Sequence, residues 1–329
     1  MEDFAEFRSW EELIPDALGL IFRNLPLQEI LTVVPRVCKS WSRAVSGPYC
    51  WQEIELDEWC RRVDSDQIER MLNLLVRRSC GSCRRIAVSG LPNDSILSFI
   101  VDHAGSLQSL ELPRSEVSDA GIEQIAGRLS NITFLDISSC KKIGARALKA
   151  FGVHCKSLIG LRRTMHPLEV AGKVCQDDEA RAIAVTMPKI RHLELAYLLL
   201  TTQGVVEILS RCADLEFLDI RGCWDVKLDE KFLKEKHPRL KVLGPEIVDS
   251  YERSFWDECS DASSEYSWEY MDDEEDDEDD DDDVYEDMSD EEIVWDDGVD
   301  EQNSERLQVR FYGGGFNEAF AGFEWPLSP

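Results

Sequence analysis

The sequence contains no long hydrophobic run and no basic leader. Leu195 to Leu200 is among the longest apolar stretches, far short of the roughly 18 residues that span a bilayer. The first four residues, MEDF, lack the basic region and the apolar stretch of a signal peptide. These absences predict a chain without a membrane segment, located in the cytoplasm and/or the nucleus. Its 11 cysteines are odd in number and widely spaced, so we expect buried thiols rather than disulfides.

Basic residues are scarce at the C-terminal end. Residues 249–329 contain 31 acidic and three basic side chains, a net charge of −28, whereas residues 1–248 carry only −2 of the total of −30. The uninterrupted acidic block 272–283 repels itself and cannot bury apolar area, so this tail is predicted to be disordered. The same charge repels phosphate backbones, which argues against direct nucleic-acid binding.

Catalytic and cofactor-binding motifs are also missing. The five histidines are scattered, and no glycine-rich phosphate loop, His-Glu-x-x-His motif or nucleophile elbow occurs. Cys80 and Cys83 form one Cys-x-x-Cys pair, but a structural zinc site needs four ligands and no second pair exists. We therefore expect no catalytic residues, no metal, no cofactor and no intrinsic enzyme activity.

What the sequence does contain, at residues 10–52, is a dense set of apolar side chains at helical spacing. Leu18, Ile21, Phe22 and Leu25 form the first set, and two similar sets follow before residue 46. Prolines at 15, 26 and 35 separate these sets, as expected at helix starts. A unit of about 45 residues with this much apolar surface usually needs a partner to cover it.

This segment resembles an F-box. The pattern Ile14-Pro15-x-x-Leu18-x-x-Ile21-Phe22-x-x-Leu25-Pro26 is followed by Val37-Cys38-x-x-Trp41, Pro48 and Trp51, with Ile14 in place of the usual leucine. The resemblance implies a three-helix unit at residues 9–55 that docks on a Skp-family adaptor and, through it, on a cullin–RING ubiquitin ligase. It implies these adaptor-binding residues, some of which also form core: Ile14, Pro15, Leu18, Ile21, Leu25, Pro26, Val34, Val37, Cys38, Trp41 and Trp51. The alternative is a plain helical cap packed on the body.

A repeat with a period near 25 residues follows. The pattern Leu-x-x-Leu-x-Leu, with related apolar residues, begins at residues 83, 107, 132, 158, 190, 215 and 240. Helical stretches separate these short strands, and stacked strand–helix units form a continuous core that one unit cannot form alone. The interval from 158 to 190 is longer because residues 164–177 contain an insertion, which is either a binding loop or a neutral surface bulge.

These units resemble leucine-rich repeats of the cysteine-containing type, with Cys140 and Cys223 at the buried turn position. The whole chain is similar to plant F-box/leucine-rich-repeat proteins of the FBW type. The expected fold is α/β: a three-helix F-box, a linker helix at 56–82, a solenoid of about six or seven repeats at 83–248, and the disordered tail at 249–329.

The solvent-facing side of the predicted strands is the candidate site for a substrate protein. Side chains alternate along a strand, so residues two and four after each repeat start face the concave side of the solenoid. We expect an acidic row to attract a basic segment and two phenylalanines to anchor a partner. The candidate substrate-binding residues are Glu111, Phe134, Asp136, Arg162, His192, Glu194, Phe217 and Asp219. The alternative is that the acids are merely solvated and the phenylalanines are covered by other parts of the chain.

Together these features predict the substrate-recognition subunit of an SCF-type ubiquitin ligase, which recruits target proteins for ubiquitination and proteasomal degradation. It would bind a Skp-family adaptor and one or more substrate proteins, without nucleic acid or membrane. The alternative function is an acidic scaffold or chaperone that binds basic nuclear proteins through its tail.

Overall fold

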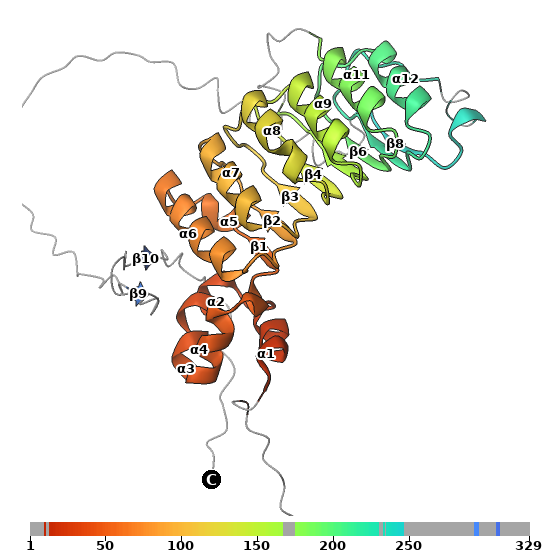
Figure 1. Cartoon of the computed structure of the whole chain (residues 1–329). Coiled ribbons are helices and arrows are strands. Elements are labelled where there is room, and N and C mark those ends of the chain that lie inside the picture. The colour runs from red at the N-terminus through yellow and green to blue at the C-terminus, as the bar shows by residue number, and fades with distance from the viewer. Residues whose placement is uncertain are drawn as a thin grey trace, which may run out of the picture.

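The computed structural model describes Trp10, residues 13–166, 175–229, 233 and 235–246, and two strands at 293–295 and 307–309. Most of the predicted acidic tail and residues 167–174 of the predicted insertion lie outside these described residues. In Figure 1 a small helical unit lies at the base of a curved solenoid, whose helices line one face while its strands line the other.

The N-terminal unit consists of short helices, most of which begin at or next to a proline. They are α1 (Pro15–Phe22), α2 (Leu27–Thr32), α3 (Val34–Val37), α4 (Lys39–Ser46) and the 3-10 helix η2 (Pro48–Cys50). Pro15 is the first residue of α1, and Pro26 is the residue that precedes α2. Both positions tolerate proline because the first backbone N–H groups of a helix have no intrahelical acceptor. The apolar residues of these helices pack around Leu18 and Phe22, which are almost fully buried.

Eight short strands form one parallel sheet in sequence order. Its strands are β1 (Glu53–Glu55), β2 (Arg85–Ala87), β3 (Ser109–Glu111), β4 (Phe134–Asp136), β5 (Gly160–Arg162), β6 (His192–Glu194), β7 (Phe217–Asp219) and β8 (Lys241–Leu243). The helices between them are α5 (Asp57–Cys60), α6 (Ser65–Arg78), α7 (Asp94–His103), α8 (Asp119–Ile125), η3 (Ala126–Arg128), α9 (Ala145–His154), α11 (Asp177–Thr186) and α12 (Thr202–Arg211). This is the α/β solenoid that the repeat predicts.

The solenoid begins earlier than the sequence analysis predicts. Strand β1 pairs in parallel with β2, so residues 56–82 are not a linker but the helical half of a first repeat unit. The sequence Trp51-x-x-Ile54-x-Leu56 is a repeat motif in which tryptophan takes the first leucine position. The sequence analysis misses this repeat motif because Trp51 also belongs to the F-box pattern. The Trp51 ring is almost fully buried, and the residue belongs both to the F-box and to the first repeat.

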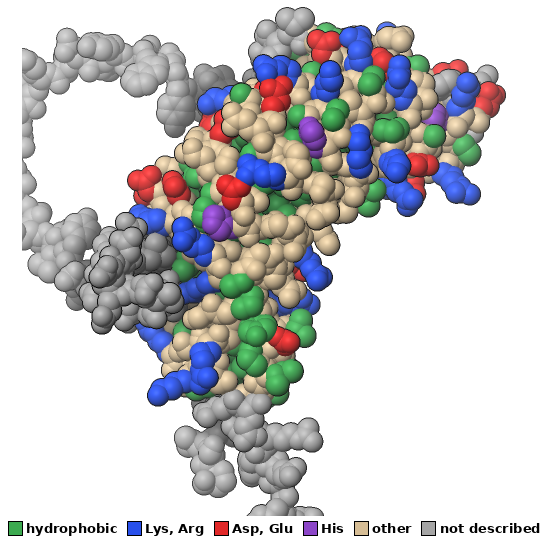
Figure 2. Space-filling model, in the orientation of Figure 1, with side chains coloured by type: hydrophobic (Ala, Val, Ile, Leu, Met, Phe, Trp, Pro, Cys, Tyr) green, Lys and Arg blue, Asp and Glu red, His purple; other side chains and the backbone are tan. Residues whose placement is uncertain are grey.

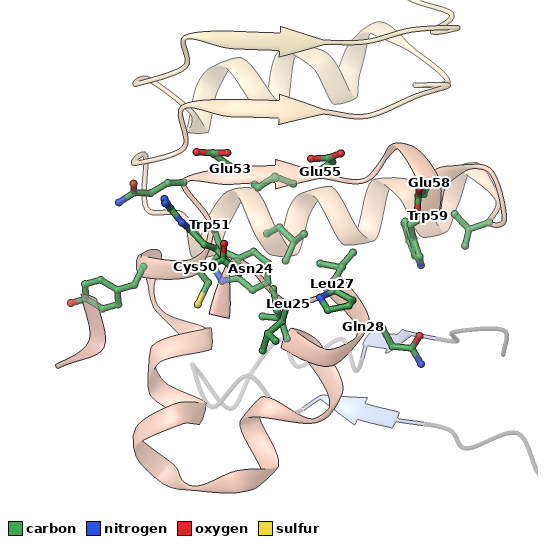
Figure 3. A pocket seen from close by; sticks show the side chains of 18 of the residues that line it. Asn24, Leu25, Leu27, Gln28, Cys50, Trp51, Glu53, Glu55, Glu58 and Trp59 are labelled. Carbon is green, nitrogen blue, oxygen red and sulfur yellow. The ribbon is translucent and has the colours of Figure 1, made fainter. Parts of the chain in front are cut away.

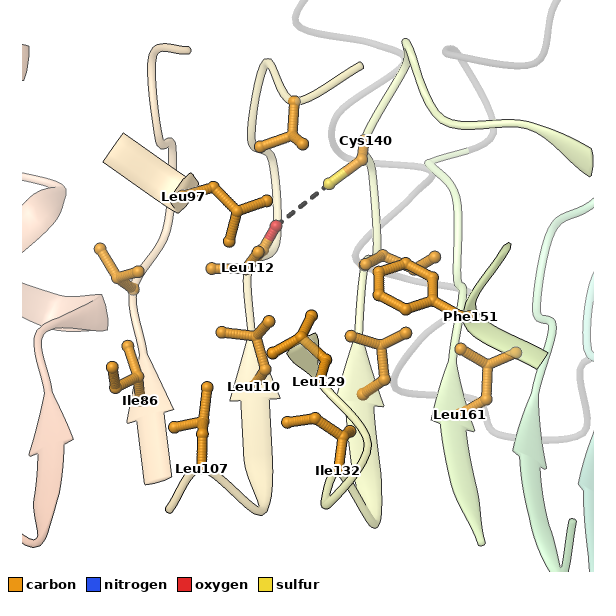
Figure 4. Packing of buried hydrophobic residues seen from close by; sticks show 14 of the residues in the cluster. Ile86, Leu97, Leu107, Leu110, Leu112, Leu129, Ile132, Cys140, Phe151 and Leu161 are labelled. Atoms are coloured by element: carbon orange, nitrogen blue, oxygen red, sulfur yellow. Dashed lines mark hydrogen bonds between the residues drawn. The ribbon is translucent and has the colours of Figure 1, made fainter. Parts of the chain in front are cut away.

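The repeat leucines stack into a continuous core behind the sheet. The register aligns the central residues of neighbouring strands, for example Leu110 with Leu135 and Leu135 with Leu161, and all three are fully buried. The Cys140 thiol donates to the carbonyl oxygen of Leu112 at 3.1 Å (Figure 4). Cys223 bonds Leu195 in the same way at 3.3 Å, so both cysteines pack at the turn as predicted.

Aspartates at the start of three helices each link their repeat to the next one. Asp94 accepts hydrogen bonds from the backbone N–H and the hydroxyl of Ser118, the residue that caps α8. Asp119 accepts from the N–H groups of Gly144 and Ala147 at the start of α9, and Asp177 accepts from Thr201 before α12. A carboxylate at a helix N-terminus satisfies free N–H groups and complements the helix dipole.

The aspartate series is interrupted where the long repeat interval occurs. Helix α9 begins with Ala145, whose methyl side chain has no oxygen to accept from the N–H groups of the following helix. There the fully buried Arg163 side chain instead donates to the carbonyl oxygens of Ile137, Cys140 and Ile143 and to the Glu179 carboxylate. This buried cation holds together two units that the aspartates do not connect.

Within the predicted tail, the described residues form one antiparallel pair, β9 (Ile293–Trp295) with β10 (Leu307–Val309), which the prediction of a disordered tail does not include. Along the described parts of the chain, no helix combines the length and the apolar character needed to cross a membrane.

Candidate functional site

Exposed apolar side chains gather on the F-box. Ile14, Ile21 and Val37, all predicted adaptor-binding residues, are 65%, 43% and 56% exposed. Trp10, Leu20 and Val33 are similarly exposed but are not in the predicted set, because the family pattern does not mark them. Figure 2 shows hydrophobic side chains concentrated on this part of the molecule. Large apolar groups that remain in water next to one another are typical of a protein interface.

Several predicted adaptor-binding residues are core residues instead. Leu18, Val34 and Trp51 are almost fully buried and therefore take the core role that the sequence analysis also allows for part of this set. Trp51 also donates its indole N–H to the Val45 carbonyl oxygen at 2.7 Å. The motif contains them because they hold the helices in place. Of the others, Pro15 and Pro26 are exposed, whereas Leu25, Cys38 and Trp41 are half-buried.

The concave face of the solenoid has two columns of side chains, defined by the strand register. One column contains Phe134, Gly160, His192 and Phe217 as neighbours, and the other contains Glu111, Asp136, Arg162, Glu194 and Asp219. The structure therefore places all eight predicted substrate-binding residues on adjacent strands of one face. Their exposure and pairing, however, differ from the prediction.

The acidic row is largely occupied by contacts within the protein. Asp136 and Asp219 are only 5% and 2% exposed, so the prediction that they present charge to a partner is wrong. Asp136 accepts the Ser138 backbone N–H at 2.9 Å, and Asp219 accepts that of Arg221 at 3.0 Å. Both carboxylates thus stabilise the turn after their own strand. Burial raises the pKa of Asp136, despite its hydrogen bonds to Ser138 and Arg162.

Arg162 and Glu194 form the centre of a charged network on this face. The Arg162 guanidinium donates to both Glu194 oxygens, at 2.7 and 3.0 Å, and lies 3.4 Å from Asp136. A His192 ring nitrogen lies 2.6 Å from Glu194. Burial favours a raised pKa for Glu194, but the bonds from Arg162 and His192 outweigh it and lower the pKa. The Glu194 carboxylate is therefore paired with Arg162 and His192 of the same protein.

The two predicted aromatic anchors are covered on their ring faces. Phe217 stacks on His192 with ring centroids 4.4 Å apart, and the Lys241 amino group lies 5.8 Å from the Phe217 centroid. The Phe134 ring occupies the space above Gly160, where a Cβ would approach it to 2.7 Å, with Arg162 nearby. Both rings are half-buried. They shape the concave face without presenting a free aromatic face.

Acidic conditions should weaken the Arg162 network. A carboxylate with a lowered native pKa contributes stability above its ordinary pKa, about 4.3 for glutamate, and loses it as pH falls through the native pKa. Comparing wild type with Arg162→Ala by thermal unfolding, we expect a Tm difference at pH 7 that shrinks as the pH falls below about 4. A Tm difference that stays constant down to pH 3 would contradict this role of Glu194.

Sequence analysis also misses residues at the F-box end of the face. Arg85 on β2 donates to Glu111 at 2.8 Å and to Glu55 at 3.0 Å. The predicted residue Glu111 is therefore paired with Arg85 and takes no part in the Arg162 network. Glu53 and Glu55 both belong to β1. Glu55 aligns with Glu111 through Ala87 and extends the acidic row toward the F-box, whereas Glu53 aligns with Ser109 through Arg85, in the other column. Recognising the Trp51 motif as a repeat start would have identified both.

The two thiols of the Cys-x-x-Cys pair lie in different environments. Cys80 is exposed while Cys83 is buried, and burial raises the Cys83 pKa to about 12, only partly offset by the bond of its thiol to the Arg85 backbone. Thiolates are the metal-binding and nucleophilic form, and burial disfavours that form at Cys83. The described residues contain no cluster of three or more histidine, cysteine or acidic side chains placed to hold a metal ion.

Comparison with known proteins gives three results. Residues 10–53 match the family model described as F-box domain. The F-box protein FBW2 of Arabidopsis thaliana is 56% identical over 279 residues, which cover 83% of this chain and 88% of that protein. In the same plant, F-box protein SKIP19 is 32% identical and covered over 78% of its length, and a relative named as F-box/LRR-repeat protein 23 is 31% identical and covered over 53%. A crystal structure of Rad7 and Elc1 from yeast reaches a TM-score of only 0.33 at 14% identity, covering 70% of this chain and 75% of that one.

Proposed function

The chain belongs to the plant F-box/leucine-rich-repeat proteins, and on that basis we propose that it is the substrate-recognition subunit of an SCF-type ubiquitin ligase. F-box proteins generally act as substrate receptors of such ligases. The observation that carries the proposal is the exposed apolar face of the F-box, with Ile14, Ile21 and Val37 in water beside a buried and well-packed core. An exposed apolar surface of this kind is typical of a protein–protein interaction site.

The proposed mechanism is proximity. The F-box binds a Skp-family adaptor, which connects the chain to a cullin–RING ligase, and the repeats hold a target protein through their concave face. A lysine of the bound target is then held at high effective concentration beside the thioester of a charged ubiquitin-conjugating enzyme. The chain itself acts as a non-catalytic adaptor, without metal or cofactor, and we place it in the cytoplasm and/or the nucleus.

The alternative function, an acidic scaffold for basic nuclear proteins, depends on the tail at 249–329. Nearly all of that tail lies outside the described residues, and none of the contacts described above favours this alternative.

Adaptor binding tests the proposal through the exposed face. We expect Ile14→Asp combined with Ile21→Asp to weaken binding of a Skp-family adaptor by roughly 30-fold or more, which corresponds to a loss of about 2 kcal/mol or more for the pair together. The measurement is a titration of the full chain with purified adaptor, with circular dichroism to verify folding. Val185→Asp, a similarly exposed residue at 52% on α11, is the matched control and should bind normally. Equal affinity for the double variant and wild type would refute the assignment of this face.

A further inference from the structure

A groove separates the F-box from the first repeat. It has a volume of about 590 Å3 and is bordered by the segment between α1 and α2, the end of η2, β1, α5 and α6. Its apolar wall includes Leu25, Leu27, Trp59 and Val63, all half-buried. Figure 3 shows Leu25 and Leu27 on the F-box side of the groove. Trp51 lies at one end of the groove and Trp59 at the other. The groove is therefore a preformed, partly apolar channel at the junction of the two parts.

Carboxylates line the repeat side of this groove. Glu53 and Glu55 project from β1, and Glu58 projects from α5 (Figure 3). Glu55 shares Arg85 with Glu111. Among the described residues no basic side chain lies within ion-pair distance of Glu53 or Glu58. Arg23 and Arg62 also border the groove but form no ion pair with these acids, so two carboxylates remain available to a cation supplied by a partner.

The groove also exposes the free edge of the sheet. Strand β1 has β2 as its neighbour on one side and no described strand on the other. Gln52 accepts from the Arg85 N–H and Leu56 donates to the Ala87 carbonyl, so the backbone groups of these alternate residues face β2. The N–H and C=O groups of Glu53 and Glu55 therefore face the opposite, open edge. Such an edge can pair with an extended peptide through main-chain hydrogen bonds.

A third feature favours a peptide over an apolar small molecule. The indole N–H of Trp59 is buried and has no hydrogen-bond acceptor among the described residues. A buried donor without an acceptor is unfavourable, and a backbone carbonyl oxygen that reaches the indole N–H satisfies it. An extended peptide supplies the carbonyl oxygen, the strand-pairing groups and a basic side chain together.

We propose that this groove binds an extended segment of a substrate protein that alternates basic and aliphatic residues. The segment pairs with the free edge of β1, its basic side chains reach Glu53 and Glu58, and its aliphatic side chains contact Leu25, Leu27 and Val63. The inference rests on the proposed receptor function and specifies its substrate class. It moves the cation-binding site from the centre of the concave face, where the acids are internally paired, to the end beside the F-box.

A synthetic ten-residue peptide of alternating lysine and valine, with a fluorescent label, tests the inference. Its binding to the full chain is measured by fluorescence anisotropy at low and physiological salt, because exposed charge pairs weaken as salt rises. We expect saturable binding that weakens at least tenfold in a Glu53→Lys/Glu58→Lys variant. Asp214→Lys/Asp225→Lys, at two exposed acids of the distant repeats, is the charge-matched control and should bind within twofold of wild type.

Two further peptides separate charge from strand pairing. The same sequence with N-methylated backbone amides retains every side chain but loses its backbone donors, and we expect at least tenfold weaker binding. A glutamate–valine peptide should not bind. Equal binding of all three peptides, or no effect of the Glu53→Lys/Glu58→Lys change, would overturn the inference.

The adaptor is the competing occupant of the groove. Titrating the same variant with a Skp-family adaptor should give wild-type affinity, and saturating adaptor should leave peptide affinity unchanged. Displacement of the peptide by adaptor, or loss of adaptor binding in the variant, would assign the groove to the adaptor and overturn the inference while supporting the proposed function. If the peptide fails to bind and the adaptor binds normally, only the inference fails. If no adaptor binds, the proposed function fails.

Discussion

Gly19→Ala is expected to destabilise the F-box, although alanine is a better helix former than glycine by about 1 kcal/mol. Gly19 is buried in α1 and packs directly on Tyr49. A Cβ at this position would lie 2.5 Å from the Tyr49 Cβ and 2.6 Å from its backbone oxygen. Backbone cannot move aside as a flexible side chain can, so the helix must shift. We expect a net loss of about 1–3 kcal/mol, the usual cost of overpacking a core.

Hydrogen exchange and thermal unfolding measure this effect. Amides of α1 and α4 should exchange faster in the Gly19→Ala variant, while those of the distant repeats keep their wild-type protection. The control is Gly127→Ala in η3, where the added Cβ finds its nearest neighbour at 3.8 Å and should be neutral or slightly stabilising. Stabilisation by Gly19→Ala would show that α1 is not packed on Tyr49 as described.

Arg163→Met is expected to lower the free energy of unfolding by about 3–5 kcal/mol, the cost of breaking a buried ion pair from one side. Arg163 is fully buried, and its guanidinium pairs with Glu179 at 3.2 Å. Its loss leaves a buried carboxylate whose remaining side-chain donor is Gln176. It also removes the side-chain donor of the Ile137 and Ile143 carbonyl oxygens, whereas the Cys140 carbonyl oxygen keeps the Ile143 backbone N–H. Arg163 joins two repeats across the gap in the aspartate series, so unfolding should begin there.

Chemical denaturation with matched variants checks this result. Arg181→Met, on the same helix as Glu179, removes ion pairs of an exposed arginine with Asp178 and Glu207 and should cost less than about 1 kcal/mol. Arg163→Met combined with Glu179→Gln removes the stranded charge and should recover part of the loss. Equal effects of Arg163→Met and Arg181→Met would contradict the role given to the buried pair.

The repeat architecture was predictable because its signal is periodic. Positions such as Leu110, Leu135 and Leu161 must all face the core if any of them does, since one register aligns the strands. The F-box was predictable for a different reason: its prolines and apolar spacing form a specific motif. The first repeat was missed because Trp51 satisfies both patterns and was assigned to only one.

The concave face shows what sequence alone could not predict. The repeat pattern correctly places Asp136 and Asp219 on the concave face. It cannot show that both carboxylates are buried there and accept backbone N–H groups from the turn that follows each strand. Nor can it show that Arg162 pairs with Glu194, because that contact depends on two side chains 32 positions apart in the sequence. The periodicity of the sequence predicts which column of the concave face a residue belongs to. Whether its charge can reach a partner depends on the side chains that pair with it, which the periodicity does not show.

The account as a whole depends on the exposed F-box face having a partner. The most direct test is a calorimetric titration of the full chain with a purified Skp-family adaptor. We predict one saturable site per chain, with a negative heat-capacity change that reports burial of the exposed apolar residues. No detectable heat or complex at any adaptor concentration, from a chain that is folded and monomeric, would contradict the central claim.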